Sequence, residues 1–167
     1  QGLQLSGLFL SQDVMQSVQK KAGKRNSQFM GKDLFIAEKP SVAKEFAKVL
    51  GVSGNAGNGY LESGDSVVTW CVGHLVTMSY PDAYDPALKK WSLQTLPFLP
   101  EKFLYELIPD VKKQFQIVAR LLNREDVTRI YVCTDSGREG EYIYRLVDQM
   151  ANVPKTKEKR RVWIDSQ

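Results

Sequence analysis

The chain has 167 residues, of which 43% are hydrophobic and 25% charged, and its formal net charge is +4. This composition is typical of a globular protein with one buried hydrophobic core, so we expect one domain. No apolar run approaches the ~20 residues that span a bilayer, so we expect no membrane partner. The small positive charge permits a polyanionic partner but does not require one.

Residues 1–32 differ in composition from the rest of the chain. A short apolar piece at residues 7–10 leads into a polar and basic run at residues 20–27. A secretory signal would place its charge before the apolar segment and a cleavage site after it, and this order does not fit. We therefore expect a leader, a tag or a disordered basic arm, and a basic arm could contact nucleic acid.

Regular structure is predicted from residue 33 onward. Asp33–Ala37 is a short apolar run typical of a buried strand. A helix is predicted over Val42–Leu50, because Pro40 fixes the backbone before it, Ser41 can cap it and Gly51 can end it. A strand followed at once by a helix is the first unit of an α/β fold.

The middle of the chain is less regular. Residues 53–64 are rich in Gly and Asn, which predicts a loop or a hairpin tip. Ser66–Val72 is predicted to be a second strand. Residues 73–109 carry most of the prolines and have weak periodicity, so we expect an irregular, partly ordered insertion in the domain that spans residues 33–167.

The last third of the chain returns to alternating elements. We predict a helix over Asp110–Asn123, a strand over Arg129–Thr134, a loop, a helix over Arg138–Met150 and a strand over Arg160–Ile164. Strands that alternate with helices predict an α/β fold with a parallel, Rossmann-like sheet and helices on both faces. Cys71 lies in one predicted buried strand and Cys133 in another, so we expect free thiols in a reducing compartment and no disulfide.

Two acidic features follow predicted strands. Glu38 comes directly after the first strand, and Asp135 comes after the strand that ends at Thr134. In open parallel α/β sheets the functional site lies at the carboxyl ends of the strands. If these two strands are neighbours, Glu38, Asp135 and Glu139 converge. Carboxylates in this position are ligands for Mg²⁺, with waters and a substrate phosphate completing its octahedron.

The loop after Thr134 also opens a helix. Backbone N–H groups at a helix N-terminus favour a phosphate, and Arg138 adds a bidentate phosphate donor. The alternative interpretation is local: Asp135 and Ser136 form a capping turn, while Glu139 and Glu141 only favour the helix dipole. A lone acidic turn fits either interpretation, but Glu38 in the matching position of another strand favours the site that holds a metal and a phosphodiester.

Three segments resemble, in order and spacing, the toprim domain of type IA DNA topoisomerases of the topoisomerase III kind. They are Ile36–Lys44, Val68–Leu75 and Thr134–Glu141. Residues 84–91 and 96–100 are similar to that family too. The resemblance extends from about residue 32 to residue 167, which is nearly the whole regular part of the chain.

This resemblance implies an isomerase that depends on Mg²⁺, cuts one DNA strand through a tyrosine, passes another strand and reseals the first. It implies that Glu38 assists proton transfer at the scissile phosphate and helps to hold the metal, that Lys39 binds the phosphate, and that Asp135 is a metal ligand. Glu38, Lys39 and Arg138 are therefore the predicted catalytic residues. The expected location is the bacterial cytoplasm, in association with the nucleoid.

The sequence departs from the family pattern in two places. The family has a second aspartate two positions after the first, whereas this chain has Gly137, which leaves Glu139 as the further carboxylate and permits a tight turn with close backbone approach to phosphate. The nucleophilic tyrosine of the family lies in a later domain. We therefore expect missing C-terminal domains of the same polypeptide to supply it, and we expect Tyr142 and Tyr144 to have packing or surface roles.

Three further residues are predicted to contact single-stranded DNA: Trp91, Lys90 and His74. An aromatic ring beside cations suits base stacking with phosphate contact, although Trp91 could equally anchor the insertion. His74 follows a strand, so it could reach the site or hydrogen-bond within the fold. The basic run at residues 155–161 is expected to be mainly a solvated loop. A toprim-type nuclease or primase and a noncatalytic DNA-binding module remain as alternative functions.

Overall fold

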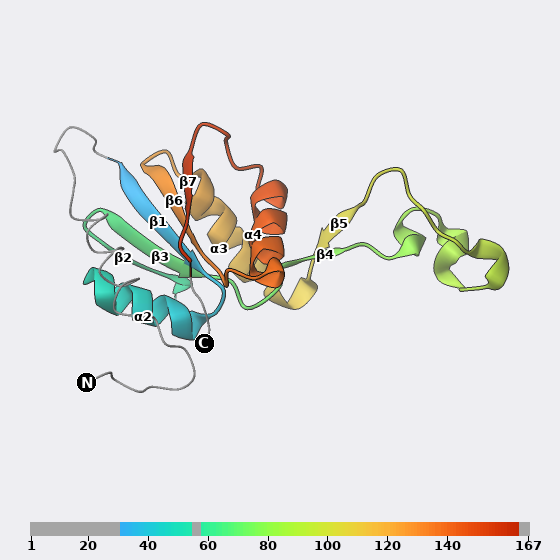
Figure 1. The fold of residues 1–167 in the computed structure, drawn as a ribbon, viewed down its shortest axis with the longest axis horizontal. Coiled ribbons are helices and arrows are strands. Elements are labelled where there is room, and N and C mark those ends of the chain that lie inside the picture. The colour runs from blue at the N-terminus through green and yellow to red at the C-terminus, as the bar shows by residue number, and fades with distance from the viewer. Residues whose placement is uncertain (1–30, 55–57, 164–167) are drawn as a thin grey trace.

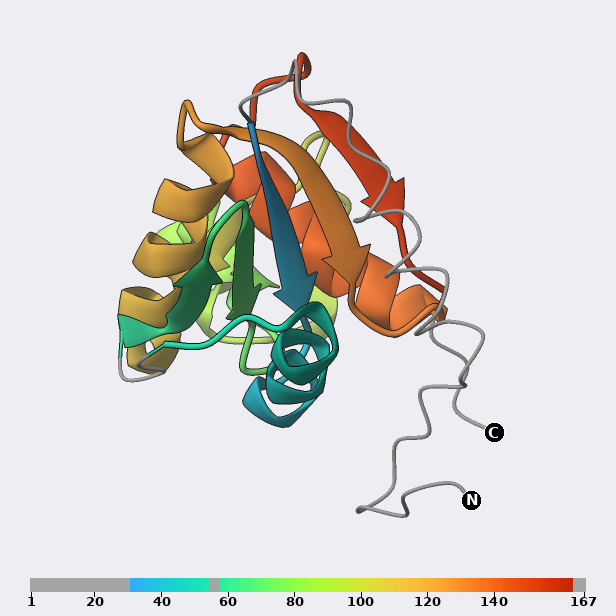
Figure 2. The ribbon, with the colours of Figure 1, turned by 90° about the vertical axis from the view of Figure 1, so that its left-hand side faces the viewer.

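A computed structural model describes residues 31–54 and 58–163 of the chain. Its main feature is a five-stranded sheet in the order β2-β3-β1-β6-β7, which Figure 2 shows from one side. The strands are β1 (Lys32–Ala37), β2 (Tyr60–Ser63), β3 (Ser66–Trp70), β6 (Val127–Cys133) and β7 (Glu158–Arg161). Strands β3, β1, β6 and β7 are parallel, and β2 is antiparallel to β3. The predicted parallel sheet is therefore confirmed, with one antiparallel strand added.

Strand β1 lies at the centre of this sheet, which explains its continuous apolar sequence. Leu34 and Ile36 are fully buried against one face, while Phe35 and Ala37 are buried against the other. A central parallel strand is covered by helices on both sides, so its side chains do not alternate between apolar and polar. The prediction of a buried strand here is confirmed, and the strand begins one residue earlier, at Lys32.

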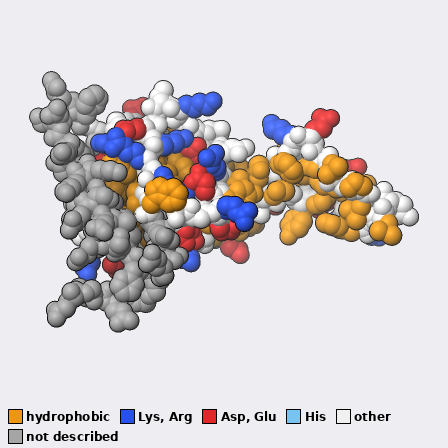
Figure 3. Space-filling model, viewed as in Figure 1, with side chains coloured by type: hydrophobic (Ala, Val, Ile, Leu, Met, Phe, Trp, Pro, Cys, Tyr) orange, Lys and Arg blue, Asp and Glu red, His pale blue; other side chains and the backbone are white. Residues whose placement is uncertain are grey.

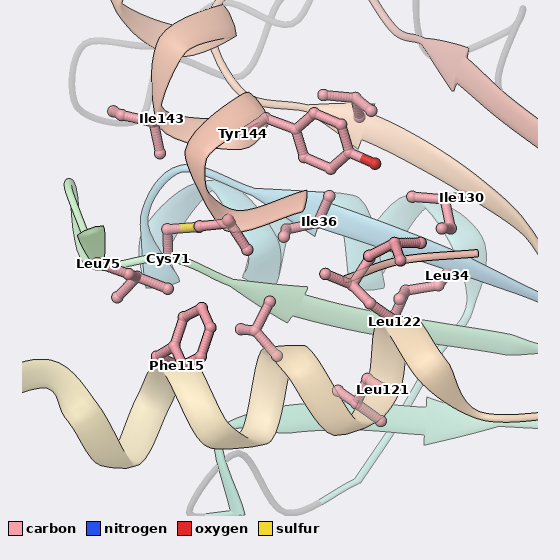
Figure 4. Close-up of a cluster of buried hydrophobic side chains, with 14 of the residues drawn as sticks. Leu34, Ile36, Cys71, Leu75, Phe115, Leu121, Leu122, Ile130, Ile143 and Tyr144 are labelled. Carbon is pink, nitrogen blue, oxygen red and sulfur yellow. The ribbon is translucent and has the colours of Figure 1, made fainter. Parts of the chain in front are cut away.

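Helices cover both faces of the sheet, as predicted (Figure 1). Helix α2 (Pro40–Leu50) packs on the face that carries Phe35 and Ala37, while α3 (Lys112–Asn123) and α4 (Arg138–Met150) pack on the other face. Figure 4 shows the larger core, in which side chains of α3 and α4 meet those of β1. Cys71 is buried in this core and Cys133 in the other, and both thiols are free, as expected, while the reducing compartment stays a prediction.

Three local predictions were wrong or incomplete. Helix α2 begins at Pro40, and its N-cap is Lys39 with no side-chain cap, so Ser41 is not the capping residue. Proline is favoured at the first helical position because its missing N–H has no partner there anyway. The stretch at residues 53–64, predicted to be a loop or a hairpin tip, contains β2, a short edge strand whose sequence lacks a clear apolar alternation. This strand forms a hairpin with β3, so the hairpin is confirmed and only the strand was not predicted. Strand β7 ends at Arg161, before the predicted end at Ile164, and Ile164 lies outside the described residues.

The insertion predicted at residues 73–109 projects from the sheet (Figure 1). At its base, β4 (Val76–Met78) and β5 (Tyr105–Leu107) form a two-stranded antiparallel ladder that periodicity did not predict. Beyond the ladder lie short 3₁₀-helices at Pro81–Ala83, Pro86–Lys89 and Leu93–Thr95. Hydrophobic side chains gather on the surface of this projecting part (Figure 3). Further along, a 3₁₀-turn at Pro109–Val111 precedes α3, which begins two residues after the predicted Asp110.

The arm predicted within residues 1–32 falls mainly on residues 1–30, which lie outside the described residues. In the part of the chain that the structure describes, no helix is long and apolar enough to cross a membrane.

Candidate metal and phosphate site

The ends of three parallel strands meet at one edge of the sheet. Ala37, the last residue of β1, pairs with Cys133 of β6 and with Trp70 of β3. Glu38 therefore lies beside the loop after β6, and the N–H of Asp135 donates to Oε2 of Glu38 at 3.4 Å. The expectation that the two strands are neighbours is confirmed, and the structure brings Glu38 and Asp135 together.

The third strand end brings His74 to the same edge. The N–H of Gly73 donates to the carbonyl of Glu38 at 3.3 Å, and Gly73 has a φ of 82°, in the left-handed region that favours glycine. Nε2 of His74 then lies 2.5 Å from Oε1 of Glu139, on the first turn of α4. The ring of His74 also meets Tyr142 edge-on, with the ring centroids 5.8 Å apart. His74 thus links the base of the insertion to α4.

The position of Glu139 differs from that of Glu38 and Asp135. Its carboxylate is engaged by His74, whereas the Glu38 carboxylate accepts a hydrogen bond from the backbone N–H of Asp135. Across residues 31–54 and 58–163, no three His, Cys, Asp or Glu side chains form a group ready to hold a metal ion. The structure therefore brings the Glu38 carboxylate to the backbone of Asp135, while the Glu139 carboxylate is engaged by His74, and the ligand set stays a prediction.

A close backbone packing holds the Asp135 loop against α4. A Cβ on Gly140 would lie 2.2 Å from the carbonyl oxygen of Asp135 and 2.7 Å from its nitrogen, so the helix can approach the loop only with glycine there. The buried Thr134 adds a hydrogen bond, in which Oγ1 donates to the carbonyl of Gly140 at 2.8 Å. The loop position is therefore fixed by its contact with the first turn of α4.

Arg161 braces the same loop from the end of β7. Its Nη1 donates to both the carbonyl oxygen and Oγ1 of Thr134, each at 2.8 Å, and its Nη2 donates to Glu141 at 2.5 Å. Burial alone would raise the pKa of Glu141, but hydrogen bonds from Arg145 and Arg161 outweigh it and hold this pKa below its usual range. Glu141 is therefore an ionised partner for two guanidinium groups.

The alternative in which Asp135 and Ser136 form a capping turn stays a prediction. The N-cap of α4 is Gly137, which has no side chain with which to cap the helix, and Glu139 and Glu141 lie in the first turn, as that alternative expects. Gly137 itself has an ordinary φ of −71°, and a Cβ on it would meet nothing within 4 Å, so the expected tight turn is not its reason for being glycine. The first N–H groups of a helix have no partner within the helix, so this helix end favours an anion.

Two exposed cations lie close in sequence to Glu38 and Asp135. Lys39 and Arg138 are both exposed, and neither forms an ion pair among the described residues. Lys39 is the N-cap of α2, and Arg138 is the first residue of α4. Lysine and arginine side chains beside carboxylates that can hold a metal ion suit a ligand that carries a phosphate group.

The remaining predicted contacts lie elsewhere. Trp91, with 69% of its surface exposed, belongs to the projecting insertion, together with Lys90. Trp91 lines a small pocket of about 170 Å³ with Pro81, Leu88 and Phe98. The structure therefore does not bring Trp91 and Lys90 together with Glu38 and Asp135, whereas His74 does reach the edge of the site.

Sequence reasoning missed Arg161, Thr134 and Gly140. Arg161 was assigned to a solvated basic run, but the run also includes Lys157, whose Nζ donates to the carbonyls of Leu122 and Arg124 at 2.7 and 2.6 Å. Part of the run is thus integral to the fold. The sequence alone held no sufficient signal, because the role of Arg161 depends on the strand order: an arginine at the carboxyl end of a strand parallel to β6 lies near the residue that follows β6.

Comparison with known proteins agrees with the motifs. The Toprim domain family matches residues 33–166. Over 137 residues the chain is 46% identical to DNA topoisomerase 3 of Bacillus thuringiensis strain Al Hakam, 44% identical to that of Shouchella clausii and 43% identical to that of Bacillus subtilis strain 168. Each match covers 82% of this chain, which spans only 18% of the length of each relative. The predicted resemblance is confirmed, and the chain belongs to the Toprim domain family.

Proposed function

We propose that this domain holds Mg²⁺ and a DNA phosphate for the strand-breaking and rejoining reaction of a type IA DNA topoisomerase. The observation that carries the proposal is the contact between Glu38 and Asp135 at the carboxyl ends of two adjacent strands. The relatives named DNA topoisomerase 3 support the reaction class. The activity of the longer polypeptide, its single-stranded DNA substrate and its place at the bacterial nucleoid in the cytoplasm are all parts of this proposal.

The donor set fits Mg²⁺. This ion usually takes one or two protein carboxylates and keeps several waters, and substrate phosphate oxygens complete its shell. Glu38 and Asp135 supply two carboxylates, and both side chains reach solvent. Bound there, Mg²⁺ supplies positive charge next to the phosphate. Glu139 becomes a further ligand only if it exchanges its contact with His74 for the metal.

The protein groups divide the remaining work. Lys39 and Arg138 bind phosphate oxygens and orient them, Arg138 through two parallel N–H donors. Glu38 would hold or release a proton at the phosphate oxygen that is attacked or that leaves. His74, Lys90 and Trp91 contact neighbouring parts of a single strand, with Trp91 stacking on a base.

The attacking tyrosine, in this proposal, comes from another part of a longer polypeptide. Tyr144 is a poor nucleophile, because burial raises its pKa and the nearby Asp148 raises it further. Its hydroxyl donates to Asp148 at 3.2 Å and is thus engaged in the packing of α4. Burial also raises the pKa of Tyr142, whose ring meets His74.

One observation favours a second candidate, a noncatalytic DNA-binding module. Glu139 is held by His74 and Gly137 carries no carboxylate, so only Glu38 and Asp135 remain for the metal. A two-carboxylate site is sufficient for Mg²⁺ when a phosphate contributes ligands. The second candidate predicts DNA binding that is indifferent to Mg²⁺.

Relaxation of negatively supercoiled DNA by the longer polypeptide tests the proposed function. We expect relaxation that requires Mg²⁺ and falls by about a hundredfold or more in E38Q and D135N. The same assay distinguishes a nuclease, because a nuclease leaves unsealed nicks in the DNA. A primase would not relax the DNA. Mg²⁺-independent DNA binding without relaxation would support the noncatalytic module and contradict the proposal.

A further inference from the structure

A second pocket lies beside the candidate site, between α4 and the residues that follow β7. It has a volume of about 630 Å³ and begins at Ser136 and Gly137, directly after Asp135. The pocket side chains that can contact a ligand are those of Arg138, Glu141, Tyr142, Arg145, Arg161 and Trp163. We call it the Trp163 pocket. Its volume lies in the range of pockets that enclose small organic groups.

The charge of the Trp163 pocket favours an anion. Three arginines face one glutamate in its lining, which leaves an excess of two positive charges. Arg145 and Arg161 share the carboxylate of Glu141, at 2.7 and 2.5 Å, and Arg138 has no ion-pair partner among the described residues. Arg145 is 75% exposed, so it can turn toward a phosphate without losing buried contacts.

The aromatic wall of the pocket is open to solvent and follows an anchored residue. Trp163 is 70% exposed, although tryptophan is highly buried on average. The preceding residue, Val162, is buried, and its N–H donates to the carbonyl of Val132 at 2.9 Å. The backbone is therefore fixed one residue before the indole. An exposed indole on a fixed backbone, beside guanidinium groups, is suited to stack on an unpaired base.

We propose that the Trp163 pocket binds one nucleotide of a single DNA strand, with its base stacked on Trp163 and its flanking phosphates on Arg138 and Arg145. This inference rests on the proposed function, because the strand is the one whose phosphate lies at Glu38 and Asp135. The pocket begins where the Asp135 loop ends, so the strand passes from one to the other without leaving the surface. A duplex does not fit, because its bases are stacked on one another and cannot lie flat on the indole.

The test is equilibrium binding of a fluorescein-labelled thymidine oligonucleotide of about ten nucleotides. Fluorescence anisotropy is measured on the 167-residue chain, once with EDTA and once with Mg²⁺. We expect W163A to weaken binding about tenfold in both conditions, because stacking on one aromatic ring contributes roughly that much. W163F keeps an aromatic ring and should stay close to the wild type. Thermal unfolding should be unchanged in both variants, because the side chain is exposed.

The charge contribution is tested separately by salt dependence. R145Q should lower the slope of log K against log salt by about 0.7, the value for one phosphate contact on a single strand. R120Q is the matched control: Arg120 is exposed on α3 and lies outside the pocket, so its slope should not change. An excess of unlabelled duplex should compete poorly with the labelled strand.

Unchanged oligonucleotide binding by W163A, or no binding by the wild type in either buffer, overturns the assignment of the pocket. The proposed metal site has its own readout, which is metal binding by the same proteins without DNA. If W163A keeps its metal affinity but loses oligonucleotide binding, the proposed metal site and the proposed nucleotide pocket are both supported. If E38Q and D135N leave the metal affinity unchanged while W163A loses the oligonucleotide, only the proposed metal site fails.

Discussion

Nε2 of His74 lies 2.5 Å from Oε1 of Glu139, across 65 residues of sequence. The pair joins the loop after β3 to the first turn of α4, and it occupies the carboxylate that the sequence offered as a third metal ligand. We therefore predict that E139Q lowers metal affinity much less than D135N does. Mn²⁺ binding measured by electron paramagnetic resonance checks this order. Equal losses in the two variants would show that Glu139 leaves His74 to bind the metal.

Gly140 and Gly137 form a matched pair for a stability test. G140A should destabilise the chain by about 1 to 3 kcal/mol or abolish folding, because its Cβ would clash with the backbone of Asp135. G137A should change stability by less than about 1 kcal/mol, because its φ is ordinary and the space around it is open. Urea denaturation of both variants gives the free energies of unfolding. A G140A variant as stable as G137A would contradict the close packing of the loop.

Arg161 is predicted to act on the metal site by positioning the loop. R161M should cost about 2 to 4 kcal/mol of folding stability, because it leaves the carbonyl of Thr134 and the carboxylate of Glu141 without these donors. R161M should also weaken Mn²⁺ binding, because Arg161 holds Thr134, the residue before Asp135. R160Q is the control, because the ion pair of Arg160 is with the exposed Glu158 and such pairs contribute about 0 to 1 kcal/mol.

The ion pairs of Glu62, on the edge strand β2, predict how folding stability depends on pH. A hydrogen bond from Arg124 is the largest influence on Glu62, and with help from Lys32 it lowers the pKa of Glu62 from 4.5 to about 2 in the folded chain, despite some burial. A carboxyl whose folded pKa is depressed stabilises the fold above its unfolded pKa and loses this contribution as pH falls through its folded pKa. Stability should therefore decline between about pH 5 and pH 2.

The matched variant is E62Q, which removes the titrating group. Its free energy of unfolding should be lower than that of the wild type near neutral pH, by about 1 to 2 kcal/mol after allowance for solvent screening. The difference between the two proteins should shrink as the pH approaches 2. A constant difference across this range would mean that the pKa of Glu62 is not depressed in the folded chain.

Covalent chemistry is not expected from the 167 residues alone. Burial raises the pKa of Tyr144, which also donates to Asp148, and burial raises the pKa of Tyr142. Incubation with a labelled single-stranded oligonucleotide and Mg²⁺, followed by denaturing electrophoresis, should show no protein-bound label. A band that Y142F or Y144F removes would identify a nucleophile within this chain.

The sequence predicted the meeting of Glu38 and Asp135 because each follows a buried apolar strand and parallel strands end at the same edge. It could not predict the contact of His74 with Glu139, because that contact depends on where the insertion leaves β3. Arg161 was missed because a basic run before a strand resembles a solvated loop until the strand order is known. Strand β2 was missed because an edge strand with one buried residue, Leu61, has little periodicity.

The central claim is that Glu38 and Asp135 together hold a divalent metal ion. Mn²⁺ binding to the 167-residue chain, followed by electron paramagnetic resonance with Mg²⁺ as competitor, tests it most directly. E38Q and D135N should each weaken binding by about tenfold or more, whereas E45Q, which removes an exposed carboxylate on α2, should not change it. Wild-type affinity in both E38Q and D135N would contradict the claim.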